Sequence, residues 1–180
     1  MKSCEREVRK LESREAEIIK ITSERLYLRP MTDAEWNEIV DSVYANDECV
    51  LHFGLEKSNE LRLIVAEPAR NEVIYYSILN SDSEELMGYV GLVTRTNNVE
   101  FYVFKDYRHK GYAYEVVKAF MDSCMSGSVT GTCCQEFVAE TVASNEHCVA
   151  LLEKLGFERC GCGFDMNTGL GVLTYKYAAR

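Results

Sequence analysis

The chain has 180 residues, which suits one compact domain and is too short for two domains of ordinary size. Hydrophobic residues make up 47% of the chain and charged residues 27%, so a disordered or low-complexity protein is excluded. No apolar run reaches the roughly 20 residues of a membrane span. The first twenty residues are densely charged and lack the apolar stretch of a signal peptide. We therefore expect a cytoplasmic protein with no membrane partner.

The net charge excludes some partners and favours others. The chain carries 29 acidic and 20 basic residues, for a formal charge of −9. An acidic domain repels phosphate backbones, so a nucleic-acid partner is not expected. The same charge attracts cations, of which amines are the commonest biological kind.

The cysteines do not form a metal or disulfide pattern. There are eight of them, but none stands in a CxxC pair. Because the chain lacks a signal peptide, we expect reduced thiols. Only three histidines are present, so a zinc site is not expected either.

The N-terminal third contains three predicted helices and a strand. Residues 4–20 place apolar side chains at helical spacing among charges, which indicates an extension over residues 1–21 before a domain over residues 22–180. This helix packs on its own domain or forms a homodimer. Residues 24–31 alternate as a strand, and Thr32 with Glu35 forms a capping box that opens the next helix. A short helix is expected over residues 59–69.

From residue 73 the hydrophobic period changes to two. Three strands joined by short turns predict an antiparallel meander, and two helices and three further strands follow. This order predicts an α+β fold with a mixed central sheet of about six or seven strands flanked by helices. The expected strands are residues 73–79, 86–94, 99–104, 136–142, 157–162 and 170–177, and the expected helices are residues 111–125 and 145–155.

The loop between residues 108 and 113 has features of a phosphate site. Gly111 and the small Ala113 allow backbone N–H groups to approach a ligand, and the helix that follows adds unpaired amides and its dipole. Arg108 and Lys110 add positive charge. The loop lacks the Lys-Ser/Thr ending of a P-loop and the three glycines of a Rossmann turn. An ordinary strand-to-helix turn is the alternative, and the residues alone leave both open.

The pattern Arg-x-x-Gly-x-Ala after a strand resembles the acetyl-CoA pyrophosphate motif of the GNAT N-acetyltransferase superfamily. The text around it, DYRHKGYAYEVVKAF, is similar to the RimJ/RimL branch of that superfamily. Residues 23–36, 87–92 and 144–157 also resemble segments of that branch, in the same order. The resemblance implies a single GNAT fold. It also implies direct transfer of an acetyl group from acetyl-CoA to a primary amine, with no metal and no covalent intermediate.

The resemblance also implies a set of residues that bind acetyl-CoA. Amides of the loop over residues 108–113 would hold the pyrophosphate, and main-chain groups of the preceding strand would bind the pantetheine arm and polarise the thioester carbonyl. The Asn before the last helix would bind the same arm and also cap that helix. The residues implied are Phe101, Tyr102, Val103, Arg108, His109, Lys110, Gly111, Tyr112, Ala113 and Asn145.

The candidate catalytic residues are Glu100 and Cys148. Glu100 lies eight residues before Arg108, where many relatives place a base, and a solvent-facing strand residue is the alternative. Some relatives use a Tyr as acid seven residues after the Asn, but here that position is Leu152. RimJ/RimL relatives often carry Ser where this chain has Cys148, whose thiol is able to protonate the departing thiolate; a packing role is the alternative.

The sequence leaves the acceptor and two rival functions open. The amine is a protein N-terminus, an amino sugar, a polyamine or an amino-acid-like metabolite. Trp36 and His52 are candidates for the acceptor pocket, although packing is the alternative for each. The rivals are a non-catalytic CoA-binding scaffold with the same fold and a nucleotide-binding α/β protein.

Overall fold

The computed structural model describes residues 20–45, 73–131, 133–166 and 169–179. Two expected helices, over residues 4–20 and 59–69, lie outside the described residues except for Lys20, and so does His52. The extension predicted over residues 1–21 stays a prediction for the same reason.

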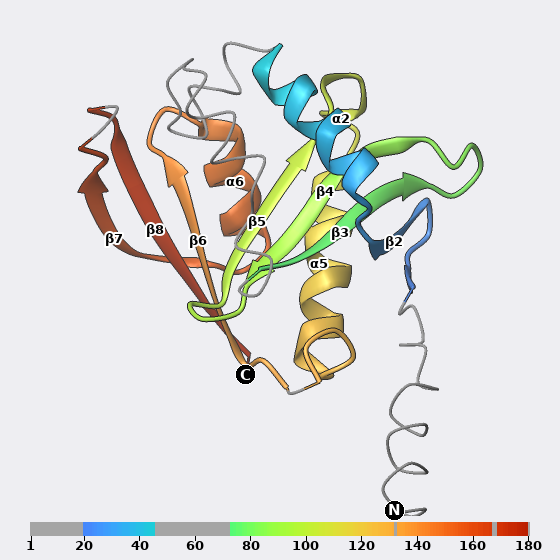
Figure 1. The fold of residues 1–180 in the computed structure, drawn as a ribbon. Coiled ribbons are helices and arrows are strands. Elements are labelled where there is room, and N and C mark those ends of the chain that lie inside the picture. The colour runs from blue at the N-terminus through green and yellow to red at the C-terminus, as the bar shows by residue number, and fades with distance from the viewer. Residues whose placement is uncertain (1–19, 46–72, 132, 167–168, 180) are drawn as a thin grey trace, which may run out of the picture.

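The described residues form one open sheet of eight strands with three α-helices (Figure 1). The strands are β1 (Ile21–Thr22), β2 (Leu26–Pro30), β3 (Val73–Asn80), β4 (Leu86–Val93), β5 (Asn98–Val103), β6 (Glu136–Val142), β7 (Glu158–Phe164) and β8 (Gly171–Ala178). The helices are α2 (Asp33–Tyr44), α5 (Tyr112–Met125) and α6 (Glu146–Lys154), with a 3₁₀ turn η1 (Lys105–Tyr107).

The α+β class and the mixed sheet are confirmed, and the strand count is one higher than expected. The strand order is β1-β2-β3-β4-β5-β6-β8-β7, and only the pair β5–β6 is parallel. The additional strand is β1, in which Ile21 pairs with Leu28 and Thr22 with Tyr27. Two residues are too few to show an alternation in the sequence, so this strand could not be predicted from its pattern.

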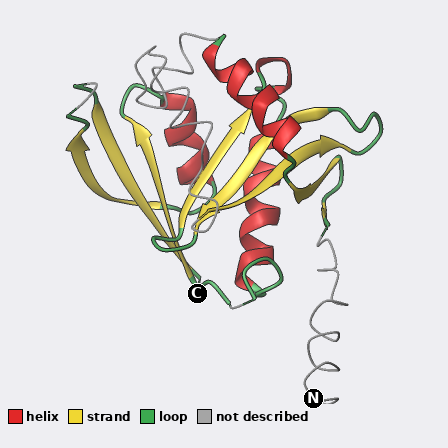
Figure 2. Ribbon diagram, viewed as in Figure 1, coloured by secondary structure: helices red, strands yellow, loops and turns green. Residues whose placement is uncertain are grey.

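The sheet is divided between β5 and β6. These two strands share a single register pair, Asn98 with Val138, close to the start of β5. Beyond that pair the strands separate, as the ribbons in Figures 1 and 2 show. All other neighbouring strands with five or more residues are paired along most of their length. The later part of β5 therefore has a sheet partner on one side only among the described strands.

Helices cover both faces of the sheet and create two hydrophobic clusters. On one face α5 buries Val116, Val117 and Phe120 completely against the sheet in the larger cluster. On the other face α2 packs Ile39 and Val43 against aromatic side chains of β4 and β5 (Figure 2). The side chains of β5 alternate between these clusters, so neighbouring residues of this strand serve opposite faces.

The capping box predicted for α2 is confirmed. Thr32 accepts a hydrogen bond from the Glu35 amide, and the Glu35 carboxylate accepts one from the Thr32 amide. Glu35 also forms an ion pair with Arg29 at 2.6 Å and accepts a hydrogen bond from Ser77. Burial opposes the ionisation of Glu35, but these hydrogen bonds outweigh it and hold the pKa of the carboxyl below its usual value. The start of α2 is thus closed by the chain itself.

None of the described helices has the length and apolar character that a membrane crossing requires.

Candidate active site

The N-terminus of α5 has no side-chain cap. Its N-cap residue is Gly111, which adopts a φ of +83° and makes no capping hydrogen bond. The first hydrogen bond along the helix joins the Glu115 amide to the Gly111 carbonyl. The N–H groups of the first turn, Tyr112 to Tyr114, therefore have no partner within the helix. Together with the positive end of the helix dipole, they make this helix start a candidate anion seat.

The loop before α5 turns its backbone toward the same place. His109 has a φ of +59°, and Gly111 follows two residues later with a positive φ as well. Such an alternation of backbone conformations makes successive N–H groups converge on a concave anion site. A Cβ added at Gly111 would meet only the Arg25 guanidinium, at 3.5 Å. Glycine is therefore favoured here by the positive φ, and lack of space for a side chain is not the reason.

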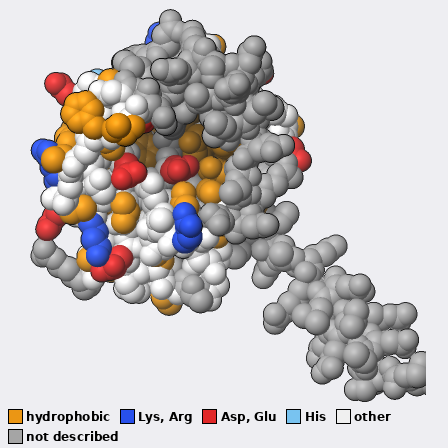
Figure 3. Space-filling view, turned by 60° about the vertical axis from the view of Figure 1, so that its left-hand side comes forward, with side chains coloured by type: hydrophobic (Ala, Val, Ile, Leu, Met, Phe, Trp, Pro, Cys, Tyr) orange, Lys and Arg blue, Asp and Glu red, His pale blue; other side chains and the backbone are white. Residues whose placement is uncertain are grey.

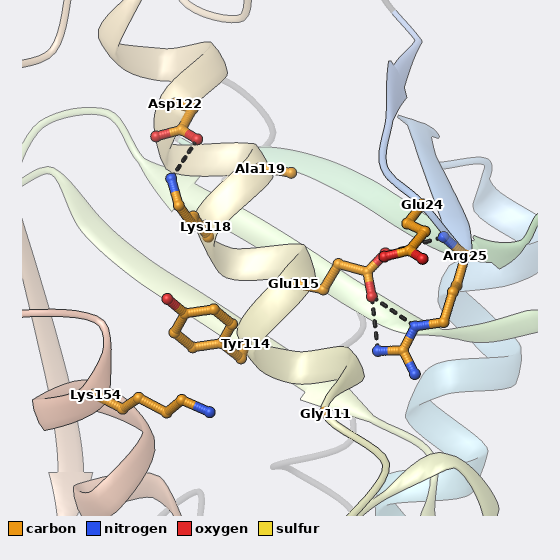
Figure 4. A pocket seen from close by; sticks show the side chains of 9 residues that line it. All are labelled: Glu24, Arg25, Gly111, Tyr114, Glu115, Lys118, Ala119, Asp122 and Lys154. Carbon is orange, nitrogen blue, oxygen red and sulfur yellow. Dashed lines mark hydrogen bonds and ion pairs between the residues drawn. The ribbon is translucent and has the colours of Figure 1, made fainter.

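Arg25 holds this loop in place from the turn between β1 and β2 (Figure 4). Its Nη1 donates to the Lys110 carbonyl at 3.0 Å, and its Nε donates to the Glu115 carboxylate at 2.9 Å. Burial opposes the ionisation of Glu115, but hydrogen bonds from Ser23 and Arg25 outweigh it and lower the pKa of this carboxyl. Sequence reasoning missed Arg25, because its partners lie 85 and 90 residues away.

A groove runs from this helix start along the outer side of α5 (Figure 4). Within it Lys118 pairs with Asp122 at 2.8 Å, and the Lys154 ammonium lies 4.6 Å from the centre of the Tyr114 ring. The described lining of the groove thus contains three cationic and three acidic side chains, and two of the cations are paired with acids. The lining residues are Glu24, Arg25, Gly111, Tyr114, Glu115, Lys118, Ala119, Asp122 and Lys154.

The later part of β5 presents main-chain groups to the gap before β6. The Phe104 amide donates to the Met87 carbonyl, and by antiparallel alternation the amide of Tyr102 also faces β4. The peptide groups of Phe101 and Val103 therefore point toward β6, which pairs with neither. Arg108 Nε donates to the Val103 carbonyl at 2.9 Å and so ties the loop to this edge. The N–H of Val103 and the N–H and C=O of Phe101 point into the gap between β5 and β6.

The start of α6 lies against the same loop. Asn145 caps α6 by accepting a hydrogen bond from the Cys148 amide at 3.1 Å, which leaves its carboxamide NH₂ as a further donor. The rings of His147 and His109 are 4.8 Å apart, so the loop and the helix start are in contact. Two helix N-termini and the open edge of β5 are thus brought to one place.

Cys148 is half-buried in the first turn of α6. Burial raises the pKa of its thiol, and a hydrogen bond with Thr141 on β6 opposes that change. The thiol is therefore protonated at neutral pH. At the position where some relatives carry a Tyr, Leu152 is buried in the larger cluster.

Glu100 lies on the opposite face of the sheet from Phe101, as the alternation predicts. Phe101 packs on the larger cluster, whereas the Glu100 carboxylate accepts a hydrogen bond from Tyr75 Oη at 3.4 Å. Burial raises the pKa of Glu100, and the Tyr75 hydrogen bond partly opposes it. Figure 3 shows a hollowed face on which acidic side chains lie among hydrophobic ones. A half-buried carboxylate with a raised pKa is better suited to accept a proton near neutral pH than a freely exposed one.

The comparison with protein families identifies the fold's relatives. Residues 25–158 match the family model described as "Acetyltransferase (GNAT) domain", which is most of the chain. The chain belongs to the GNAT acetyltransferase family. The resemblance to the GNAT superfamily seen in the sequence is thereby confirmed.

Solved structures of GNAT proteins share this fold at low sequence identity. An acetyltransferase from Salmonella typhimurium that modifies the N-terminal serine of ribosomal protein L7/L12 has a TM-score of 0.69 and 16% identity, and the match covers 90% of this chain and 100% of that one. Spermidine N-acetyltransferase from Vibrio cholerae, in complex with CoA and spermine, has a TM-score of 0.68 and 16% identity over 85% and 95% of the two chains. No curated protein sequence matches the chain.

A third structure shows the ligand of such a fold. RimL, the L7/L12 α-N-protein acetyltransferase, in complex with coenzyme A has a TM-score of 0.65 and 16% identity, with coverage of 89% of this chain and 98% of that one. At this identity the likeness establishes the fold of the present protein and leaves its substrates to be argued from its own residues.

Proposed function

We propose that this GNAT protein transfers the acetyl group of acetyl-CoA to a primary amine. The observation that carries the proposal is the uncapped start of α5 beside the open edge of β5. A diphosphate requires converging N–H donors and positive charge, and an extended amide-containing arm requires unpaired strand groups. This chain places both within a few residues of each other.

The donor is held by main-chain groups in this proposal. The amides of residues 109–113 bind the pyrophosphate. The Arg108 amide, which the sequence also predicted as a donor, already donates to the Lys105 carbonyl at 3.2 Å, so Arg108 adds charge together with Lys110. The pantetheine arm lies along β5 and pairs with Phe101 and Val103, while the Asn145 carboxamide donates to the arm. The amide of Val103 or Phe101 donates to the thioester carbonyl and stabilises the negative charge that develops on its oxygen.

Glu100 acts as the general base. A primary amine with a pKa near 10 is mostly protonated at neutral pH, so it must lose a proton before attack. The Glu100 carboxylate takes that proton directly or through a water. The amine nitrogen then forms a bond to the carbonyl carbon and loses its second proton to solvent, the carbon–sulfur bond breaks, and the CoA thiolate leaves. Glu100 returns its own proton to solvent. Cys148 donates the proton that this thiolate acquires, and the thiol of Cys148 is restored from solvent.

The acceptor is a cationic amine in this proposal. Structural neighbours act on an N-terminal serine and on spermidine, and both match this chain with 16% identity. The likeness therefore does not separate a protein N-terminus from a polyamine. The net charge of −9 favours an acceptor with positive charge.

A thiol-release assay with acetyl-CoA and a panel of amines tests the proposal. The panel contains spermidine, an amino sugar, and peptides that begin with Ser or Ala. We expect turnover with at least one amine, and Glu100→Gln should lower kcat by about 100-fold. Cys148→Ala should lower kcat by about tenfold if the thiol supplies the proton. Tight CoA binding without turnover of any amine would instead identify a CoA-binding scaffold.

A further inference from the structure

We infer that Tyr75 is a positioning residue, which holds the Glu100 carboxylate in place and favours its ionised form during the reaction. The inference rests on the proposed role of Glu100 as base. It adds a residue on β3 that no motif in the sequence assigns to the site.

The three central strands place the two side chains in one row. Tyr75 on β3 pairs with Gly91 on β4, and Gly91 pairs with Glu100 on β5. The outer residues of such a row are two strands apart, about 10 Å between backbones. A long side chain that lies across the middle strand spans this distance, and Tyr75 Oη reaches Glu100 Oε2 at 3.4 Å.

Gly91 makes room for the Tyr75 ring. A Cβ at this position would lie 2.6 Å from Cδ1 and 2.9 Å from Cε1 of Tyr75, which is closer than carbon atoms approach. The ring therefore occupies the space that any other side chain at position 91 would fill. Glycine is needed here for space, because its backbone is in an extended region open to all residues.

Two further rings fix the orientation of Tyr75. The Trp36 ring from α2 lies 4.9 Å from the Tyr75 ring, and the Tyr89 ring lies 5.6 Å away in an edge-to-face arrangement. Rings at these separations attract one another, so the two contacts favour one orientation of the Tyr75 ring. Trp36 thus contributes to the site through Tyr75, which is a more definite role than a place in the acceptor pocket.

The charged and titratable surroundings of Glu100 are few among the described elements. Tyr75 on β3 and Tyr89 on β4 interact with its carboxylate, and both are neutral because burial raises their pKa values. Across the gap, Glu140 on β6 accepts a hydrogen bond from the Thr174 hydroxyl. Among the described groups, the Tyr75 hydroxyl donates a hydrogen bond to the Glu100 carboxylate and so stabilises its negative charge.

The Tyr75→Phe variant tests the inference, because it removes the hydroxyl and keeps the ring. Without this donor Glu100 ionises less readily, so its base function is lost first at low pH. We expect kcat/KM to fall about threefold to tenfold on the acid side of the pH profile and to stay within about twofold on the alkaline plateau. Tyr76→Phe is the matched control, since Tyr76 lies on the opposite face against Phe120 and its profile should equal that of the wild type.

A second variant approaches the same contact from the backbone. Gly91→Ala displaces the Tyr75 ring and should shift the acid side of the profile in the same direction. Adding Tyr75→Phe to Gly91→Ala should produce no further shift, because both changes remove one contact. An unchanged profile in Tyr75→Phe, or an equal loss at every pH, overturns the inference. An unchanged rate in Glu100→Gln overturns the proposed base itself, so the two failures are distinguishable.

Discussion

The starts of α2 and α5 solve the same problem in opposite ways. Every helix begins with N–H groups that have no partner within the helix. At α2 the capping box of Thr32 and Glu35 satisfies the Glu35 amide and the N-cap amide, and Arg29 and Ser77 hold the carboxylate from two strands. At α5 the N-cap is Gly111, which has no side chain and provides no cap.

The two helix starts differ in what they contribute, since one contributes stability and the other is available for binding. The closed start of α2 stabilises the fold and offers nothing to a ligand. The open start of α5 gives up a cap worth about 1 kcal/mol and keeps its donors available. Arg25 then supports the open end from the side, through the Lys110 carbonyl and Glu115, without covering the amides of the first turn.

The largest effect is expected when charge is placed at the open end. Gly111→Asp puts a carboxylate at the anion seat and should weaken CoA binding by about 100-fold, since like charges at contact distance repel strongly there. Gly111→Asn is the matched control, because it has the same shape, the same strain at positive φ and no charge. Isothermal titration with CoA measures both. Equal affinities in the two variants would place the pyrophosphate elsewhere.

At the start of α2, removing the charge of Glu35 should lower the stability of the protein and leave its affinity for CoA unchanged. Glu35→Gln should destabilise the protein by about 2 kcal/mol at pH 7, measured by urea unfolding, with unchanged CoA affinity. The folded-state pKa of Glu35 is lowered, so its contribution is fully present above the ordinary value near 4.3 and is lost as the pH falls through the folded-state value. The difference between variant and wild type should therefore shrink in acid. A constant difference down to pH 3 would show that the charge is not its source.

The smallest effect concerns the lateral support of α5. Arg25→Gln should weaken CoA binding about threefold and lower stability by less than about 1 kcal/mol, because the pair with Glu115 is partly exposed. Arg95→Gln, at an exposed position in the turn between β4 and β5, is the control and should change neither quantity. A loss of affinity as large as that of Gly111→Asp would make Arg25 a direct ligand of the anion.

Local signals made most of the fold predictable. The capping box located the start of α2, and the change of period from helical to two located β3, β4 and β5 within about two residues. The hairpin of β7 and β8 was also expected. Its order in the sheet, with β8 rather than β7 beside β6, depends on long-range packing that no local pattern encodes.

The candidate site was predictable where it consists of contiguous chain. The loop over residues 108–113 carries its glycine and its charges within six positions, so both could be read together. Arg25 and Tyr75 could not be found in that way. Arg25 reaches the loop across 85 residues, and Tyr75 reaches Glu100 only because β3, β4 and β5 align in one register.

Because β5 and β6 share the single register pair Asn98–Val138, the later part of β5 directs backbone groups toward a strand that does not pair with them. The pantetheine arm of acetyl-CoA, bound there as proposed, would pair its amides with β5 as a neighbouring strand does. The bound acetyl-CoA and the sheet would then open as one cooperative unit. Binding of acetyl-CoA should therefore slow deuterium uptake at the amides of Phe101 and Val103 and stabilise the contact between the two halves of the sheet. The two halves of the sheet would therefore be held together more strongly in the donor complex than in the free protein.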